Sequence, residues 1–306
     1  MQAHEEISRF KPASDTVFTI GVFDGVHRGH QHLIKQVISE AKAQNCLSGV
    51  VTFLNHPRTV LRPQEPVGFL MTREERLRAL KTHGLDLVVP ITFDLDLSKQ
   101  RPHEFCSLLQ QSLRMKTLVI GPNFVMGFQR EGTPEMLQRL GQEMGFAVHV
   151  VEPLVQGTEM VSSSTLRRTL SEGKVSEVTN YLGHPFALEG LVVNGERRGT
   201  SLGFPTANLE VDKEVVLPGD GVYAAWAYVE GKGRWKAATN IGVRPTFGPG
   251  QRTVEAFLID FDGNLYNQRI RLEFAHRLRD ELRFDSPDDL IKQMHEDIRQ
   301  TEELLF

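Results

Sequence analysis

The alternation of short apolar segments with helix-like segments in the first half of the chain is the feature that most restricts its fold. Helices are predicted at about residues 29–44, 102–113, 134–144 and 163–182. Between them lie short segments that are apolar almost throughout, at residues 17–21, 49–53, 87–91, 117–120 and 147–151. Such strands, alternating with helices, are typical of a parallel sheet covered by helices on both faces.

The pattern changes after Pro185, where strand-like segments come in pairs. Turn residues at 230–233 separate residues 223–229 from 235–241, and turn residues at 262–264 separate residues 254–261 from 268–274. Such pairs predict β-hairpins, and they indicate a compact antiparallel sheet or barrel in this half.

A last helix is predicted at the end of the chain. It begins at the N-cap Ser286, has Pro287 in its first turn and runs to about Leu304. We therefore expect an α/β chain of two domains, residues 1–183 with the parallel sheet and residues 184–306 with the antiparallel strands. A chain of 306 residues is long enough for two domains that each bury a core.

Composition restricts the partners. No apolar run approaches the roughly 20 residues of a membrane span, and the N-terminus has acidic residues but no apolar signal-peptide core. The net charge of -4 argues against a broad nucleic-acid-binding surface. Cys46 and Cys106 lack the spacing of a metal or redox site, which indicates structural thiols in a reducing compartment. We expect a cytoplasmic protein with small-molecule substrates and no membrane or nucleic-acid partner; the oligomeric state stays open.

Two histidines, His27 and His30, stand where the first predicted strand turns into the first predicted helix. Backbone N–H groups at a helix N-terminus lack an intrahelical partner, and the helix dipole favours negative charge there. Gly29 between them would let a ligand approach the backbone, and the imidazoles could stabilise charge on a leaving pyrophosphate. A metal site or a structural role are the alternatives, although no third ligand lies nearby at helical spacing. We interpret the pair as a phosphate site.

Three further segments end strands or open a helix, where an open α/β sheet binds its ligands: residues 52–57, 120–127 and 161–167. The serines of the third segment could be a plain N-cap, but Arg167 one turn later favours a second phosphate contact. Together with the histidine pair, these segments resemble the FMN adenylyltransferase module of the bacterial bifunctional riboflavin kinase/FAD synthetases. These modules are Rossmann-like nucleotidyltransferases with an HxGH signature.

The resemblance implies that His27 and His30 are catalytic. It implies nucleotide-binding roles for Gly21, Phe23, Asp24, Gly29, Asn123, Ser163, Ser164 and Arg167; Asp24 by itself indicates only a turn-former. The chain departs from the family at Asn55, where proline is common, and at Ser163-Ser164-Thr165, which lacks the arginine that often follows the motif. We still expect an active module, because both histidines and Arg167 are present.

Residues 203–208 carry two oxygen-bearing side chains two positions apart. In an extended chain this spacing places Thr206 and Asn208 on the same face. Hard oxygen ligands suit Mg²⁺, which accompanies the phosphates of a nucleotide. A simple turn is the alternative, because proline, threonine and asparagine are all common in turns.

With residues 240–246 and 253–255, this segment resembles the riboflavin kinase module of the same bifunctional enzymes, over about residues 186–304. The resemblance implies that Glu255 is the catalytic base and that Thr206 and Asn208 hold Mg²⁺. It implies nucleotide-binding roles for Gly195, Gly203, Pro205, Thr206 and Asn208, and flavin-binding roles for Phe204, Arg279 and Glu281. Without the resemblance, Glu255 is an ordinary strand residue, and Arg279 and Glu281 belong to a solvated run of charges. Thr200 and Asn267 depart from the family pattern, although asparagine tolerates positive φ.

The resemblance implies a two-step enzyme, in which the second half converts riboflavin and ATP to FMN and the first half converts FMN and ATP to FAD. The riboflavin hydroxyl is neutral at pH 7, so a carboxylate that accepts its proton assists attack, whereas the phosphate of FMN is already an anion. The first half accordingly has no carboxylate placed as a base. The alternative is a flavin- or nucleotide-binding regulator with one decayed site, which Asn55, Thr165 and Thr200 motivate.

Overall fold

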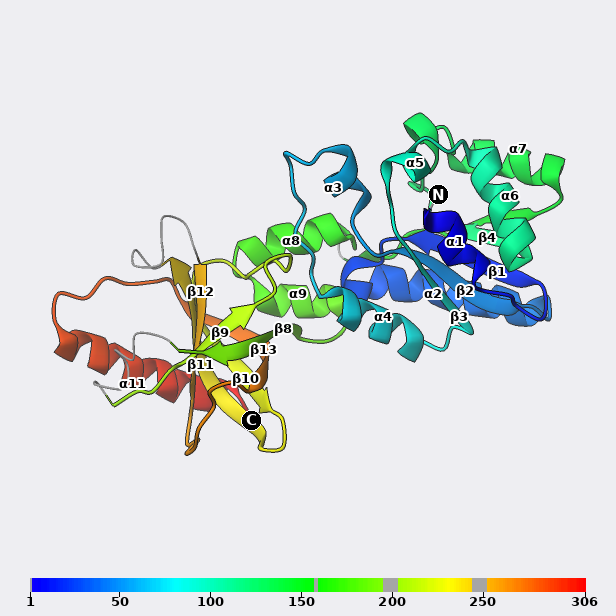
Figure 1. Cartoon of the computed structure of the whole chain (residues 1–306). Coiled ribbons are helices and arrows are strands. Elements are labelled where there is room, and N and C mark those ends of the chain that lie inside the picture. The colour runs from blue at the N-terminus through cyan, green and yellow to red at the C-terminus, as the bar shows by residue number, and fades with distance from the viewer. Residues whose placement is uncertain (1, 157–158, 195–202, 244–251) are drawn as a thin grey trace. The chain divides into compact units, whose positions relative to one another are not determined.

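A computed structural model describes residues 2–156, 159–194, 203–243 and 252–306 of the chain (Figure 1). The chain forms two compact units, Met1–Ser162 and Ser163–Phe306. Each unit has its own sheet and its own buried residues, and each is described by itself below.

The first unit is built on a five-stranded sheet in the order β3-β2-β1-β4-β5, and every neighbouring pair is parallel. Its strands are β1 (Thr16–Gly21), β2 (Leu47–Phe53), β3 (Leu87–Ile91), β4 (Met115–Ile120) and β5 (Ala147–Val150). A small hairpin of β6 (Val155–Gln156) and β7 (Glu159–Met160) follows the sheet.

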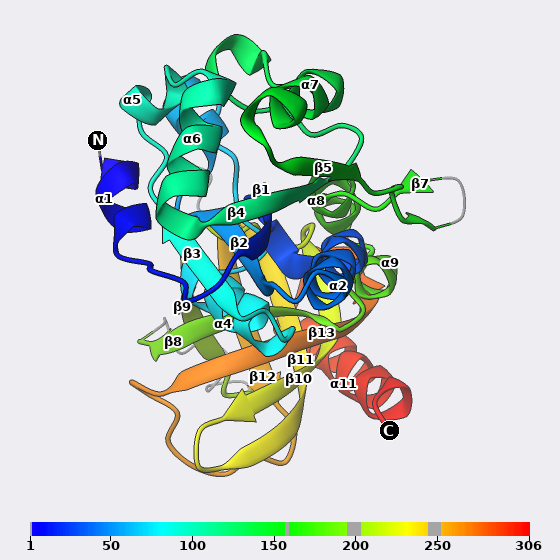
Figure 2. The same cartoon turned by 90° about the vertical axis from the view of Figure 1, so that its right-hand side faces the viewer.

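Helices cover both faces of this sheet because successive strand side chains point to opposite sides (Figure 2). Phe18 and Ile20 of β1 belong to a core with residues of α1 (Gln2–Ser8), α6 (Pro102–Leu113) and α7 (Pro134–Met144). Val17 of the same strand belongs to a second core, with α2 (Arg28–Ala43) and α4 (Arg73–Thr82). The shorter helices are η1 (Asp24–Val26), α3 (Pro57–Leu61), α5 (Leu95–Ser98) and η2 (Phe128–Arg130).

The second unit is a closed antiparallel barrel in the order β10-β11-β12-β9-β8-β13. Its strands are β8 (Phe186–Val193), β9 (Ala207–Val211), β10 (Gly221–Val229), β11 (Gly233–Val243), β12 (Arg252–Leu258) and β13 (Arg269–Arg279). Buried side chains alternate with more exposed ones along β8 and the first part of β13. Helix α9 (Val175–Leu182) packs on β13 and β8, and α11 (Pro287–Leu304) packs on β11, β10 and β13.

The predicted fold class is confirmed: a parallel sheet with helices comes first, and an antiparallel barrel with a terminal helix follows. The single helical stretch predicted over residues 163–182 is wrong. It forms two helices, α8 (Ser163–Ser171) and α9, because Gly173 adopts φ +74° between them. Strand β13 continues to Arg279, beyond its predicted end at residue 274, and β12 ends earlier than predicted, at Leu258.

The compact units divide between Ser162 and Ser163, upstream of the change in sequence pattern near residue 184. Packing explains the difference, because α8 contacts α9 and α9 contacts the barrel strands. The boundary between residues 183 and 184 stays a prediction for the functional modules. Among the described helices, none has both the length and the apolar composition needed to cross a membrane.

Candidate active sites

The two histidines of the first unit lie together at the start of α2. His27 is the N-cap of this helix, and its Nδ1 accepts a hydrogen bond from the backbone N–H of His30 at 3.3 Å. Their imidazole rings stack, with 3.6 Å between centroids and 17° between planes. The ring of Phe23 lies 5.0 Å from that of His30. The turn that holds these rings is tight, since Phe23 and Val26 both have positive φ.

His30 is held in its neutral form. Burial, His27 and the Arg76 guanidinium together keep the pKa of His30 well below 6.5. Its Nδ1 is buried and makes no hydrogen bond within the part of the chain that the structure describes. A neutral imidazole that carries its proton on an unused ring nitrogen can donate a hydrogen bond to an arriving phosphate oxygen.

Three other predicted residues shape the turn around the histidines. A Cβ at Gly29 would lie 3.0 Å from the carbonyl oxygen of Val161 and 3.1 Å from Nδ1 of His27, so only glycine fits there without a shift of its neighbours. The carboxylate of Asp24 is buried and accepts the backbone N–H of Leu70 at 2.9 Å, which fits its interpretation as a turn-former. A Cβ at Gly21 would lie 3.1 Å from the ring of Phe23. Ligand approach at Gly29 stays a prediction.

Sequence reasoning missed Arg76 of α4, which is only 1% exposed. Its Nη2 donates to the carbonyl oxygens of Phe53 and Leu54, at 2.8 and 3.0 Å, where β2 ends. Its guanidinium carbon lies 4.9 Å from the centre of the Phe69 ring. The chain therefore holds a buried positive charge at the carboxyl edge of the sheet, close enough to His30 to affect its pKa. The only sequence signal near Arg76 is the capping box Thr72–Glu75, which predicts the start of a helix.

The departure at Asn55 has a structural role. Its side-chain amide pairs with the backbone of Phe93: Nδ2 donates to the carbonyl oxygen at 2.8 Å, and Oδ1 accepts the N–H at 2.9 Å. This pair ties the chain just beyond β2 to the chain just beyond β3. Asn55 thus orders the edge of the sheet at which ligands are expected.

The remaining predicted nucleotide contacts of the first site are spread over both units. Asn123 lies exposed after β4, with its Nδ2 at 3.8 Å from the sulfur of Met160. Ser163, Ser164 and Arg167 lie in the first turns of α8, in the second unit. Their placement beside the histidine pair stays a prediction.

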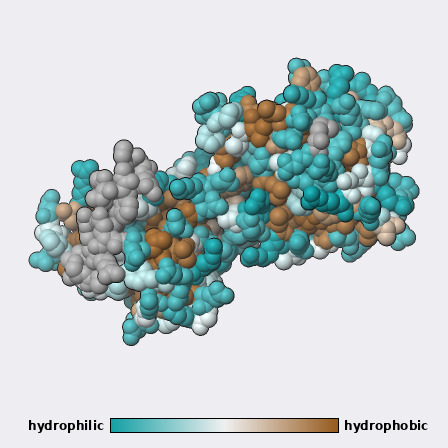
Figure 3. Space-filling model, in the orientation of Figure 1, coloured by the Kyte–Doolittle hydropathy of each residue, from teal (hydrophilic) through white to brown (hydrophobic). Residues whose placement is uncertain are grey.

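An apolar groove of about 430 Å³, which no sequence motif predicted, lies beside α3 and α5. The groove is lined by Val60, Phe93, Asp94, Leu95 and Asp96. Leu95 is 59% exposed, and Figure 3 shows brown, apolar surface in the region of α3. Such a groove offers an aromatic ring an apolar face.

In the second unit, three polar residues lie side by side on neighbouring strands. Glu255 of β12 is paired with Asn208 of β9 on one side and with Asn240 of β11 on the other. Directly paired residues of antiparallel strands place their side chains about 4.5–5.5 Å apart on one face. Glu255 is 6% exposed, and its Oε1 accepts a hydrogen bond from Oγ1 of Thr253 at 3.3 Å. The strand pairing therefore brings Asn208 to the proposed base.

Thr206 and Asn208 alternate with the buried side chains of Ala207 and Leu209, as expected for two residues on one face of an extended chain. Their side-chain oxygens are hard donors of the kind that Mg²⁺ prefers, and the carboxylate of Glu255 is adjacent. This donor set fits Mg²⁺. No cluster of three or more His, Cys, Asp or Glu that could hold a metal is found in the described ranges.

The predicted flavin contacts are more engaged with the protein than the sequence suggests. Phe204 is 5% exposed and packs edge-on against Phe257 at 5.6 Å and against His295 of α11 at 5.1 Å. Arg279 forms an ion pair with Asp297 of α11, so a solvated run of charges does not describe it. Glu281 is exposed and lies against β11, where its Oε1 accepts a hydrogen bond from Asn240.

The structure describes some of the turn residues of the second half. Gly203 adopts φ +89° just before the exposed Pro205, and Asn267 adopts φ +61°, the positive φ that its position was expected to need. Gly195, Thr200 and residues 244–246 lie outside the described residues, so their predicted roles stay predictions.

Comparison with known proteins assigns both halves. The FAD synthetase family model matches residues 10–165, and the riboflavin kinase family model matches residues 182–305. The bifunctional riboflavin kinase/FMN adenylyltransferase of Escherichia coli K12 is 34% identical over 94% of this chain and 91% of its own length. The chain belongs to the bifunctional riboflavin kinase/FMN adenylyltransferase family.

A second curated relative and one solved structure are also similar to nearly the whole chain. The Bacillus subtilis bifunctional riboflavin kinase/FMN adenylyltransferase is 32% identical, over 92% of this chain and 90% of its own length. A Streptococcus pneumoniae structure described as a macrolide-efflux protein has a TM-score of 0.89 at 28% identity, and the match covers 99% of this chain and 97% of that one. That description concerns the pneumococcal protein; the two family models and the named relatives identify the present chain as a riboflavin kinase and FMN adenylyltransferase.

Proposed function

We propose that the two activities reside in separate modules, residues 1–183 and residues 184–306, and that the barrel module performs the first step. The riboflavin kinase match contains the row of Asn208, Glu255 and Asn240, and this row is the observation that supports the assignment. In this step the terminal hydroxyl of riboflavin attacks the γ-phosphorus of ATP. A new O–P bond forms, the bond to ADP breaks, and Glu255 takes the hydroxyl proton. Thr206 and Asn208 would hold Mg²⁺, which would neutralise charge on the phosphates.

The N-terminal module, residues 1–183, then transfers an adenylyl group to FMN. An oxygen of the FMN phosphate attacks the α-phosphorus of ATP, the bond to pyrophosphate breaks, and no base is required because the nucleophile is already an anion. His27 and His30 stabilise charge on the departing pyrophosphate from the N-terminus of α2. Asn123, Ser163, Ser164 and Arg167 supply further phosphate contacts. A cytoplasmic location and the absence of nucleic-acid partners accompany this proposal.

One flavin assay tests the division of labour. Purified protein is incubated with riboflavin, ATP and Mg²⁺, and the flavins are separated. Glu255→Gln should stop FMN formation from riboflavin, yet still convert supplied FMN to FAD. Glu210→Gln, at an exposed glutamate of β9, is the matched control and should leave both steps unchanged. Tight flavin binding with neither product would instead support a regulator and overturn the proposal.

A further inference from the structure

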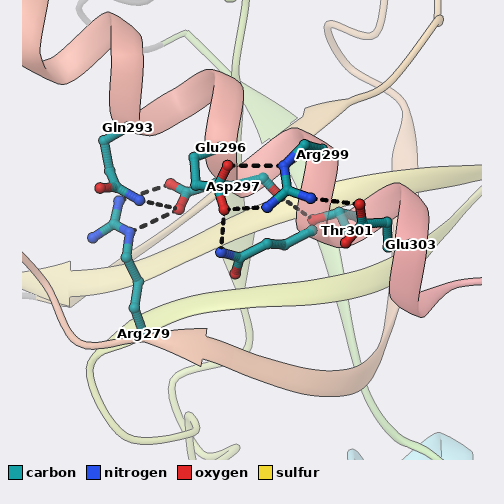
Figure 4. Close-up of polar contacts among 8 residues, drawn as sticks. Arg279, Gln293, Glu296, Asp297, Arg299, Thr301 and Glu303 are labelled. Carbon is teal, nitrogen blue, oxygen red and sulfur yellow. Dashed lines mark hydrogen bonds and ion pairs between the residues drawn. The ribbon is translucent and has the colours of Figure 1, made fainter.

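The guanidinium of Arg279 is anchored on the C-terminal helix (Figure 4). Its Nε and Nη2 donate to the two carboxylate oxygens of Asp297, at 2.8 and 2.7 Å, and Gln293 donates to the same carboxylate at 3.0 Å. The side chains of Arg279 and Asp297 are 19% and 6% exposed. A bidentate pair this far from solvent fixes the orientation of both partners.

The third nitrogen of the same guanidinium fixes the chain that follows β13. Nη1 of Arg279 donates to the carbonyl oxygen of Asp280 at 2.9 Å. Three of the five guanidinium N–H groups, one on each nitrogen, therefore donate hydrogen bonds inside the barrel unit, and these bonds fix the plane of the guanidinium. Arg279 is better placed to position its neighbours than to bind a ligand.

Glu281, which follows Asp280 in the chain, contacts β11. Its Oε1 accepts a hydrogen bond from Nδ2 of Asn240 at 3.4 Å. Its carboxylate also lies directly over Gly242, where any Cβ would collide with it. The close approach to Gly242 places the Glu281 carboxylate within reach of the Asn240 amide.

Asn240 is in turn the direct cross-strand neighbour of Glu255. A continuous series of contacts thus runs from Asp297 through Arg279, Asp280 and Glu281 to Asn240, beside the proposed base. We propose that Asp297 and Arg279 are positioning residues that orient Glu255 through Glu281 and Asn240. This inference rests on the proposed function, in which Glu255 is the base. The C-terminal helix is then a part of the kinase site, although none of its residues need touch a substrate.

The test uses the full chain, in which FAD formation from supplied FMN serves as the internal control. Asp297→Asn keeps the shape of the side chain but weakens the ion pair, and Asn240→Ala removes the last contact of the series. Each should lower the kcat of FMN formation about ten-fold, with the KM for riboflavin and the rate of FAD formation within about two-fold of the wild type. Glu302→Gln, at an exposed glutamate of the same helix, should change neither step.

The double variant distinguishes a shared series from independent roles. Asp297→Asn combined with Asn240→Ala should lose no more activity than the worse single variant, because both changes interrupt the same series. Multiplicative losses, an unchanged kcat, or a raised KM for riboflavin with normal kcat would overturn the proposal; the last result would mean that Arg279 contacts the flavin. If Asp297→Asn fails to fold, Gln293→Ala takes its place, because it leaves the ion pair between Arg279 and Asp297 intact. Gln293→Ala should give a smaller loss of kcat for FMN formation. A wild-type kcat in this variant would also overturn the proposal.

Rejection of the positioning series can be distinguished from failure of the proposed function. A wild-type protein that forms no FMN, or a Glu255→Gln variant that still forms it at the wild-type rate, would reject the assignment of Glu255. A wild type that forms FMN and a Glu255→Gln variant that does not, together with unaffected Asp297 and Asn240 variants, would reject only the positioning series.

Discussion

The imidazole of His30 stacks on that of His27 at 3.6 Å in the first turn of α2, and the buried Nδ1 of His30 makes no hydrogen bond in the described part of the chain. The two side chains of the proposed phosphate site are thus oriented before any ligand arrives. His27 is itself fixed, because its ring caps α2.

Replacing His30 by alanine should separate the two activities. We expect His30→Ala to lower the rate of FAD formation from FMN by about 10²–10³-fold, because a preorganised group that stabilises the leaving pyrophosphate is lost. FMN formation from riboflavin should be unchanged, so that FMN accumulates. His103→Ala, at an exposed histidine of α6, is the matched control. Equal loss of both activities in a folded His30→Ala protein would contradict the assignment.

The lowered pKa of His30 predicts a pH-dependent stability. Besides burial, the ionisable groups that lower the pKa of His30 are His27 and Arg76. The unfolded chain binds a proton at His30 near pH 6.5, while the folded chain does so only at a lower pH, so stability falls as the pH drops between these two values. In urea unfolding at pH 7.5, 6.5 and 5.5, the wild type should lose stability relative to His30→Gln by up to about 1.4 kcal/mol per pH unit below 6.5. Parallel pH dependence of the two proteins would refute this.

We expect Arg76 to affect the stability of the first unit only. Arg76→Met removes two charge-assisted hydrogen bonds, to Phe53 and Leu54, and should lower the free energy of unfolding of this unit by about 1.5–3 kcal/mol. It also removes a positive charge near His30, so the pKa of His30, followed by NMR, should rise. Arg78→Met, at an exposed position of the same helix, should do neither. An unchanged pKa of His30 would show that the charge of Arg76 is not felt there.

Gly29 should tolerate no side chain. In Gly29→Ala the new Cβ would press on the carbonyl of Val161 and the ring of His27, so we expect a loss of about 1–3 kcal/mol in stability and slower FAD formation. Gly121→Ala has open space around its Cβ and serves as the control for stability alone. Wild-type unfolding of Gly29→Ala would mean that the turn relaxes at no cost.

Local patterns predicted much of this molecule. Helix α6 and strand β3 have their predicted bounds, because proline at the start of a helix and short apolar runs act within a few residues. The sequence did not predict strands β8 and β9, which complete the barrel. Their pairing with β13 and β12 joins residues far apart in the chain, and no local pattern encodes such a register.

The same limit applies to the sites. The histidine pair and its helix N-terminus are local, and the sequence by itself determined them, as it did the alternation that places Thr206 and Asn208 on one side of an extended chain. Only the tertiary structure decided that Arg76 is buried at the edge of the sheet, that Asn240 stands beside Glu255, and that Arg279 is bound to Asp297. Burial and cross-strand neighbours depend on how distant segments pack, so residues of ordinary local sequence acquire their roles only in the folded chain.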